Sequence, residues 1–254
     1  MVWQDEDFEK LEEEEYESTL ETFALLALLL SNSNSDIEKE LALFYQKYGK
    51  NGIVNYQESR KKISKNNHRK RINELYLTID TILDALVLDT HNEFKSAFTS
   101  IINREMEFFN QPIDVEKVLS TTWGVDELNW EMRLTNFRNR WDFKLANDLK
   151  LAMLKNEPLS TVIKKLSKDF GSMENGLWTL YTTEYSAIQS ITRHAIFKEM
   201  GVKKYRYYAR ADERTCDTCG SMHGLIFPMT AYQTGVTASP MHPHCRCWEV
   251  PIME

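Results

Sequence analysis

The chain has 254 residues, of which 42% are hydrophobic and 27% are charged, so it can bury a core as one large or two smaller domains. Nine glycines and six prolines argue against a loop-rich β architecture and fit long helices. The formal net charge of −7 is uneven, because residues 1–22 hold ten acidic residues and one lysine and the remaining chain sums to +2. The overall charge therefore does not exclude a nucleic-acid partner.

Residues 1–35 form an acidic segment that runs into an apolar stretch at 23–30. A secretory signal has basic residues before its apolar stretch, whereas this one follows acidic residues. Eight residues are also too few to span a bilayer as a helix. We therefore expect a cytosolic chain without stable membrane insertion, in which this helix is buried in a core or an oligomer. The polar sequence SNSNSD at 31–36 predicts a break, so residues 1–35 are interpreted as an N-terminal arm.

Residues 36–200 are predicted to form a helical body. A first helix is expected to end near Gly49 or Gly52. The stretch 56–110 has no glycine or proline, and its apolar residues recur at three- and four-residue steps, which indicates a helix. Further helices are expected over 114–156, up to Phe170, and over 174–200. Gly201 stands where a C-terminal helix cap is expected. Within the last helix, Glu184 and Arg193 are candidates for an interior ion pair.

In the last part of the chain, residues 201–254, the residue pattern changes from one typical of helices to one typical of short strands. Three short β-strands are predicted within 202–212, 225–229 and 247–252, separated by glycines and prolines. The predicted fold is therefore mainly α, with an elongated helical body followed by a small C-terminal α+β module resembling a zinc knob.

All four cysteines lie in this module, as Cys216-x2-Cys219 and, after 25 intervening residues, Cys245-x-Cys247. Two such pairs brought together make a tetrahedral site suited to structural Zn²⁺. His242 precedes the second pair, so the ligands are either the four cysteines or Cys216, Cys219, His242 and one of Cys245 and Cys247. Reduced thiols without metal, a disulfide and an open catalytic site are the alternatives. A module this small has little core of its own, and bound metal would supply folding free energy.

Several sequence elements occur together in this region. They are Thr183-Glu184, a Gly-Val-x-x-Tyr turn, Asp212-x-Arg214-Thr215-Cys216-x-x-Cys219, His223-Gly224 and His242-Pro243-x-Cys245-Arg246-Cys247. In this order they resemble the C-terminal signature of the phage head morphogenesis family, the Mu F-like minor head proteins. The tryptophan- and arginine-marked stretch from Trp123 is also similar, so the resemblance covers residues 120–254.

The resemblance implies a non-enzymatic minor capsid protein for head morphogenesis and DNA ejection. Such a protein binds the portal protein inside the capsid and resides in the virion, after assembly in the host cytoplasm. Scaffold or capsid protein and packaged double-stranded DNA are further expected partners. Many relatives carry serine or threonine where Cys216 and Cys247 stand, so metal is not a requirement of the whole family. The alternative function is a metal-dependent enzyme acting on nucleic acid or the host and delivered with the genome, with Asp212 or Glu213 near an open metal position.

A basic segment lies at 60–71 and contains no acidic residue. It is either a solvated helix face, a partner for an acidic arm, or a patch that contacts DNA phosphates without sequence preference. Its candidate nucleic-acid-binding residues are Arg60, Lys61, Lys62, Lys65, Arg69, Lys70 and Arg71.

Overall fold

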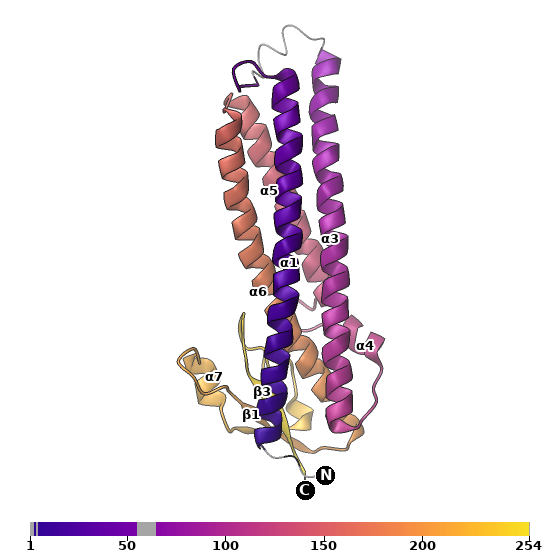
Figure 1. Cartoon of the computed structure of the whole chain (residues 1–254). Helices are drawn as coiled ribbons and strands as arrows, with labels where there is room; N and C mark the ends of the chain where they lie inside the picture. The colour runs from indigo at the N-terminus through magenta and orange to yellow at the C-terminus, as the bar shows by residue number, and fades with distance from the viewer. Residues whose placement is uncertain (1–2, 4, 55–64, 254) are drawn as a thin grey trace. The chain divides into compact units, whose positions relative to one another are not determined.

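The computed structural model describes residues 3, 5–54 and 65–253, and it describes residues 5 and 65–72 by their backbone alone. The helices are α1 (Asp5–Tyr48), α3 (Lys65–Phe109), α4 (Val115–Ser120), α5 (Trp130–Leu154), α6 (Leu159–Glu199) and α7 (Asp217–Met222). The strands are β1 (Lys204–Tyr208), β2 (Ile226–Pro228) and β3 (Trp248–Ile252), with a short 3-10 helix at Met229–Ala231 (Figure 1). The predicted mainly α fold with a small C-terminal β-containing module is confirmed.

The three strands form one antiparallel sheet in the order β2-β1-β3. In the register of the central strand, Tyr205 lies opposite Phe227 on one side and Pro251 on the other. Tyr205 and Tyr207 are fully buried, whereas their neighbours are partly or fully exposed. The alternation of tyrosines that predicted a strand therefore corresponds to a half-buried sheet surface.

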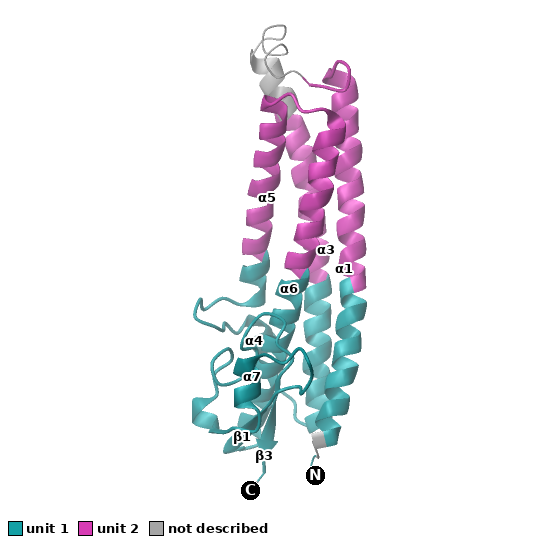
Figure 2. Cartoon of the chain, turned by 90° about the vertical axis from the view of Figure 1, so that its left-hand side faces the viewer, with its two compact units in different colours: residues 1–23, 93–134, 178–254 teal, residues 24–92, 135–177 magenta. Residues whose placement is uncertain are grey.

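The chain divides into two compact units that interleave along the sequence (Figure 2). Unit 1 comprises residues 1–23, 93–134 and 178–254, and unit 2 comprises residues 24–92 and 135–177. The predicted division at residues 35 and 200 follows the chain order instead and stays a prediction.

Unit 1 contains the sheet, α4, α7 and parts of the long helices. An aromatic group joins its helices, since the Phe98 ring lies 5.4 Å from that of Trp130 and 5.8 Å from that of Tyr181. A second core joins helices to the sheet, with Phe109 and Phe197 packed in the same cluster as Tyr205 and Trp248. The C-terminal sheet therefore shares a core with helical residues.

The described residues of unit 2 comprise segments of α1, α3, α5 and α6. Its buried apolar side chains recur at three- and four-residue steps, as in Leu26 and Leu30 of α1 and Leu75, Ile79 and Leu83 of α3. Leu25 and Leu28 of α1 are 50% and 57% exposed. The apolar stretch at 23–30 is thus buried on one side only. No helix among the described residues is long and apolar enough to cross a membrane.

Three predicted helix boundaries are wrong. Helix α1 continues through 31–36, because Ile37 and Leu30 are buried on either side of the polar residues and Asn34 donates a hydrogen bond to Glu38 one turn on. Helix α6 likewise continues through Gly171. Conversely, residues 121–129 interrupt the helix predicted over 114–156, with Gly124 and Glu127 at positive φ.

The predicted cap at Gly201 is confirmed. Gly201 has φ of +70°, and its N–H donates to the Lys198 carbonyl while that of Val202 donates to the Phe197 carbonyl. This pair of bonds is a Schellman motif, and Phe197 and Val202 belong to the same core cluster. The cap therefore turns the chain from α6 directly into β1.

Candidate metal centre

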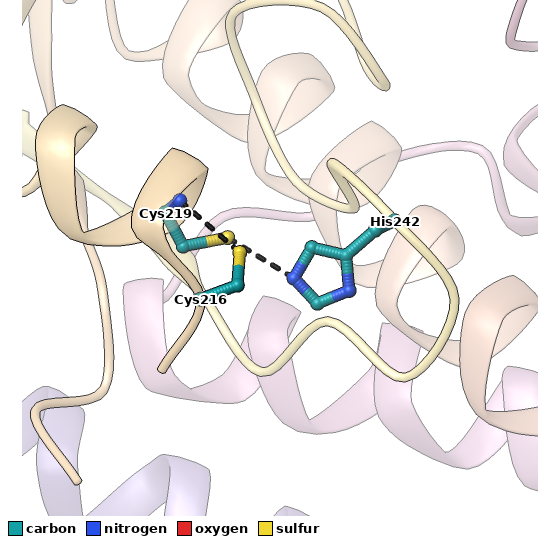
Figure 3. A group of neighbouring side chains, drawn as sticks. All are labelled: Cys216, Cys219 and His242. Atoms are coloured by element: carbon teal, nitrogen blue, oxygen red, sulfur yellow. Dashed lines mark hydrogen bonds between the residues drawn. The ribbon is translucent and has the colours of Figure 1, made fainter. Parts of the chain in front are cut away.

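Short local elements position the five predicted donors. Cys216 caps the N-terminus of α7, where its sulfur accepts a hydrogen bond from the Cys219 N–H at 3.4 Å. Cys219 follows one turn into the helix, and Figure 3 shows both sulfurs facing the imidazole of His242. Cys245 and Cys247 lie in the loop that leads into β3. All four cysteines are free thiols.

The donors form two overlapping groups. The ligand atoms of Cys216, Cys219 and His242 lie within 4.8 Å of one another, as do those of Cys219, Cys245 and Cys247. Cys219 belongs to both groups, so a metal held by Cys216, Cys219 and His242 has the C-x-C pair beside it as a source of the fourth ligand. The structure thus brings together every residue that the spacing predicted.

The distances around Cys219 suit a tetrahedral ion. Its sulfur lies 3.8 Å from that of Cys245 and 3.3 Å from His242 Nε2. Two thiolates bound to Zn²⁺ at about 2.3 Å in tetrahedral geometry lie about 3.8 Å apart, and a thiolate and an imidazole nitrogen slightly less. The donor set therefore fits zinc or another ion that prefers sulfur and nitrogen.

The orientation of His242 also suits a ligand. Its Nδ1 lies 2.8 Å from the Pro243 carbonyl oxygen, an acceptor, so Nδ1 carries the proton and donates it. The lone pair is then on Nε2, the nitrogen that faces Cys219. Burial lowers the pKa of His242, but the bond to Pro243 and the nearby thiols outweigh it and raise the pKa overall. In a metal-binding histidine, the ring nitrogen that does not bind the metal usually donates a hydrogen bond, as Nδ1 does here.

Behind the sulfurs lies the side chain of Tyr207 from β1. Its hydroxyl donates to the Cys219 sulfur at 3.5 Å and lies 3.9 Å from that of Cys245. Hydrogen bonds donated by the thiols of Cys219 and Cys247 lower the pKa of Cys245. The same hydrogen bonds raise the pKa of Cys219 and Cys247. Hydrogen bonding within this buried trio favours a thiolate at one of the three cysteines, the form that binds metal.

Asp212 takes part in an ion pair beside the cluster. Both of its carboxylate oxygens accept hydrogen bonds from Arg246, at 2.5 and 2.6 Å, and Oδ1 also accepts the Arg214 N–H. The Arg246 hydrogen bonds hold the pKa of Asp212 well below its usual range. Since Arg246 stands between Cys245 and Cys247, this pair ties the C-x-C loop to the loop before α7. Glu213 is exposed.

The other two histidines of the module have separate hydrogen bonds. His244 lies at φ of +59°, with Nε2 3.0 Å from the Thr179 hydroxyl and Nδ1 2.8 Å from that of Thr182, both on α6. His223 Nδ1 accepts the Ala209 N–H at 3.2 Å. They anchor the loops around the cluster.

Sequence reasoning missed a buried ion cluster in unit 1. Arg193 is fully buried and donates to both oxygens of Glu105 on α3 and to Glu12 on α1, while its Nη1 donates to the Glu249 carbonyl on β3. The predicted pair of Glu184 with Arg193 is therefore wrong. A signal was present, because Arg193 lies among apolar residues that recur with the helical period from Ala187 to Phe197.

Glu184 has different partners. It accepts a hydrogen bond from Trp123 Nε1 at 2.9 Å and from Arg133 Nη1 at 3.1 Å, and the Arg133 guanidinium stacks on the Trp123 ring at 4.2 Å. Burial raises the pKa of Glu184 to about 7, although both partners lower it. This contact holds the 121–129 loop against α6.

The basic segment at 60–71 lies largely outside the described residues. Arg60, Lys61 and Lys62 are not described, and Lys65, Arg69, Lys70 and Arg71 are described only as backbone at the start of α3. Their predicted contact with DNA stays a prediction.

The comparisons with known proteins bear on the C-terminal part of the chain. Residues 144–250 match the family described as phage Mu protein F like protein. The matched stretch contains α6, β1, β2, the first three residues of β3 and all five residues of the candidate metal centre. The predicted resemblance to phage head morphogenesis proteins is confirmed over these residues. Residues 120–143 lie outside the match.

One curated relative is an uncharacterized protein of Haemophilus influenzae (strain KW20 / Rd), 28% identical over 149 residues. The aligned stretch is 57% of this chain and 31% of that protein, so this chain spans about a third of the relative's length. No solved structure gives a significant match.

Proposed function

We propose that this chain is a minor head protein that binds the portal protein inside the phage capsid and resides there in the virion. The observation that carries the proposal is the family match over residues 144–250. The ordered signature, from Thr183-Glu184 to Cys247, supports it. Scaffold or capsid protein contacts and a part in DNA ejection belong to the same proposal, as does assembly in the host cytoplasm.

Co-expression with the portal protein of the same genome tests portal binding. A tagged chain is expected to sediment with the portal oligomer in a density gradient. A portal protein from an unrelated phage serves as the control and should leave the chain at the top. If the chain migrates alone with its own portal protein, portal binding is refuted.

We also propose that the cysteine cluster holds a structural Zn²⁺. Support comes from the 3.8 Å sulfur separation, the proton arrangement of His242 and the thiolate-favouring trio. Purified chain is expected to contain about one zinc per molecule. Cys219→Ser should abolish this content because Cys219 belongs to both donor groups. Thr218→Ser, on the exposed side of α7, is the matched control and should retain it.

Non-specific contact of residues 60–71 with packaged DNA is a further part of the proposal. Replacing Lys61, Lys62 and Arg69 by glutamine should lower affinity for double-stranded DNA and flatten its dependence on salt. Replacing the exposed Lys164, Lys168 and Lys198 instead is the control. Equal effects of the two triple variants would refute a specific role for the segment.

A metal-dependent enzyme has less support than a non-enzymatic head protein. A catalytic zinc needs an open position and a nearby general base. Five potential protein donors lie in the two overlapping groups, enough to fill a four-coordinate site. Arg246 engages both oxygens of Asp212, the carboxylate proposed from the sequence as a base. Asp212 is therefore best explained as part of a loop clamp.

A further inference from the structure

Unit 1 contains a cavity beside the candidate metal centre, since His242, Cys245 and Cys247 lie in its wall. It has a volume of about 470 Å³ and lies between α1, α6 and the loops around 210–214 and 242–247. The parts of α1 and α6 that line the cavity belong to unit 1, as do both loops (Figure 2). Sites for small molecules typically have volumes of this order.

Two residues of the cavity wall carry buried polar atoms without partners among the described residues. Ser186 on α6 is 6% exposed and Glu15 on α1 is 2% exposed, and both line the cavity. Within the described part of the chain, neither Ser186 Oγ nor Glu15 Oε1 has a hydrogen-bond partner. A buried polar atom left unpaired costs free energy, so two of them beside one cavity point to a ligand that supplies both a donor and an acceptor.

Aromatic rings form part of the cavity wall. Tyr16 comes from α1 and Trp178 from α6, one from each of the two helices that border the space. The Arg210 guanidinium lies 5.9 Å from the centre of the Tyr16 ring. Aromatic faces favour a flat, unsaturated ligand, because such rings stack on one another.

The outer end of the cavity is basic. Arg214 is exposed and Arg210 is half-buried, and neither makes an ion pair with a described residue. Arg246 also lines the space, but Asp212 already neutralises it. Two arginines that form no ion pair with the described residues favour an anionic group at the solvent end, above all a phosphate.

We propose that this cavity binds a nucleotide, with the base against Tyr16 and Trp178, its polar edge toward Ser186 and Glu15, and its phosphate at Arg210 and Arg214. Inorganic phosphate would leave the rings and the inner polar atoms unused. An uncharged aromatic compound would leave the arginines unused. The inference rests on the cavity alone and is independent of portal binding.

The same chemistry has two sources, a free nucleotide and the terminal nucleotide of a DNA strand. Calorimetric titration of the full chain separates them, using each of the four deoxynucleoside monophosphates and a short 5′-phosphorylated oligodeoxynucleotide. Saturable binding of one nucleotide per chain is expected. Tighter binding of the oligonucleotide identifies a strand end as the source, and tighter binding of the monophosphate identifies the free nucleotide.

Two further probes, deoxyadenosine and inorganic phosphate, dissect the ligand. Each lacks one half of a nucleotide, so each should bind at least about tenfold more weakly than deoxyadenosine monophosphate. Inorganic phosphate binding as tightly as the nucleotide would reduce the site to a general anion site and overturn the proposal. The absence of binding by every nucleotide probe at millimolar concentration would overturn it as well.

Two variants and a control locate the binding in the cavity. Arg214→Glu should weaken nucleotide binding about tenfold, whereas Lys168→Glu, the same charge change on an exposed residue outside the cavity, should not. Ser186→Ala should also weaken binding without lowering the free energy of unfolding, because its hydroxyl has no partner to lose. If Ser186→Ala and Arg214→Glu both bind nucleotide as the original chain does, the assignment is wrong.

Discussion

Replacing Arg193 by methionine tests the buried ion cluster that joins α1, α3, α6 and β3. Arg193 and Glu105 are both completely buried, and Arg193 Nε lies 3.0 and 2.9 Å from the two oxygens of Glu105. Methionine keeps an apolar stem of similar length but leaves the carboxylates of Glu105 and Glu12 without their cation. Breaking a buried pair in this way costs about 3–5 kcal/mol of unfolding free energy.

Urea unfolding followed by circular dichroism measures this loss. Lys39→Met is the control, because Lys39 pairs with Asp36 at a site where both side chains are more than half exposed. Such a surface pair contributes about 0–1 kcal/mol. The double variant Arg193→Met with Glu105→Leu removes both charges and should recover part of the stability lost by Arg193→Met alone.

Acid should also restore stability to Arg193→Met. Burial already raises the pKa of Glu12 and Glu249, the carboxyls around Arg193, to about 7. Without the arginine these groups are protonated more readily, so the variant should lose less stability at pH 5.5 than at pH 8. A loss below about 1 kcal/mol at pH 8 would refute the view that this arginine compensates buried charge.

Three further predictions concern stability. Because burial raises the pKa of Glu184 to about 7 from 4.5, the folded chain binds the extra proton between these pH values. The stability that this raised pKa contributes is fully present below pH 4.5 and is lost as pH rises through 7. The melting temperature should therefore fall from pH 5.5 to 8, and it should fall less in Glu184→Gln. Gly201→Ala should cost about 1 kcal/mol in urea unfolding, because Gly201 has φ of +70°. Phe98→Ala should cost about 3–5 kcal/mol and Phe143→Ala, at a residue 77% exposed, close to nothing by the same measurement.

The sequence predicted features that depend on local signals. The three strands and the cap at Gly201 follow from neighbouring residues. The spacing of two short cysteine motifs likewise indicated the group of five candidate metal ligands. Helix boundaries that depend on packing were predicted less well. Helix α6 continues through the predicted break at Gly171 because Phe170, Met173 and Leu177 remain buried around it, a packing requirement that the sequence alone does not express.

The interruption at 121–129 was missed for a similar reason. It depends on Trp123 and Arg133 reaching Glu184, which is 51 or more residues away along the chain. The ion cluster of Arg193 joins residues up to 181 apart. Patterns of polarity reveal that such residues are buried or exposed, but not which distant residue compensates each charge.

The shared core changes the expected role of the metal. The sequence interpretation assigned the folding of the whole C-terminal module to bound metal, because residues 201–254 alone would have a small core. In the structure, Tyr205, Trp248 and Val250 of the sheet pack with Phe8, Phe109 and Phe197 of the helices. The sheet thus has apolar support that does not depend on a metal.

The cysteines belong to a separate small cluster with Tyr207 and Ala209. The two clusters meet at β3, where Cys247 precedes the strand and the Glu249 carbonyl accepts from Arg193. Metal removal should therefore loosen the loops between 209 and 247 while β1 and β3 stay paired. Amide hydrogen exchange, measured after a chelator has removed the metal, tests this difference. If the Tyr207 and Val250 amides lose as much protection as the α7 amides, the metal stabilises the sheet as well.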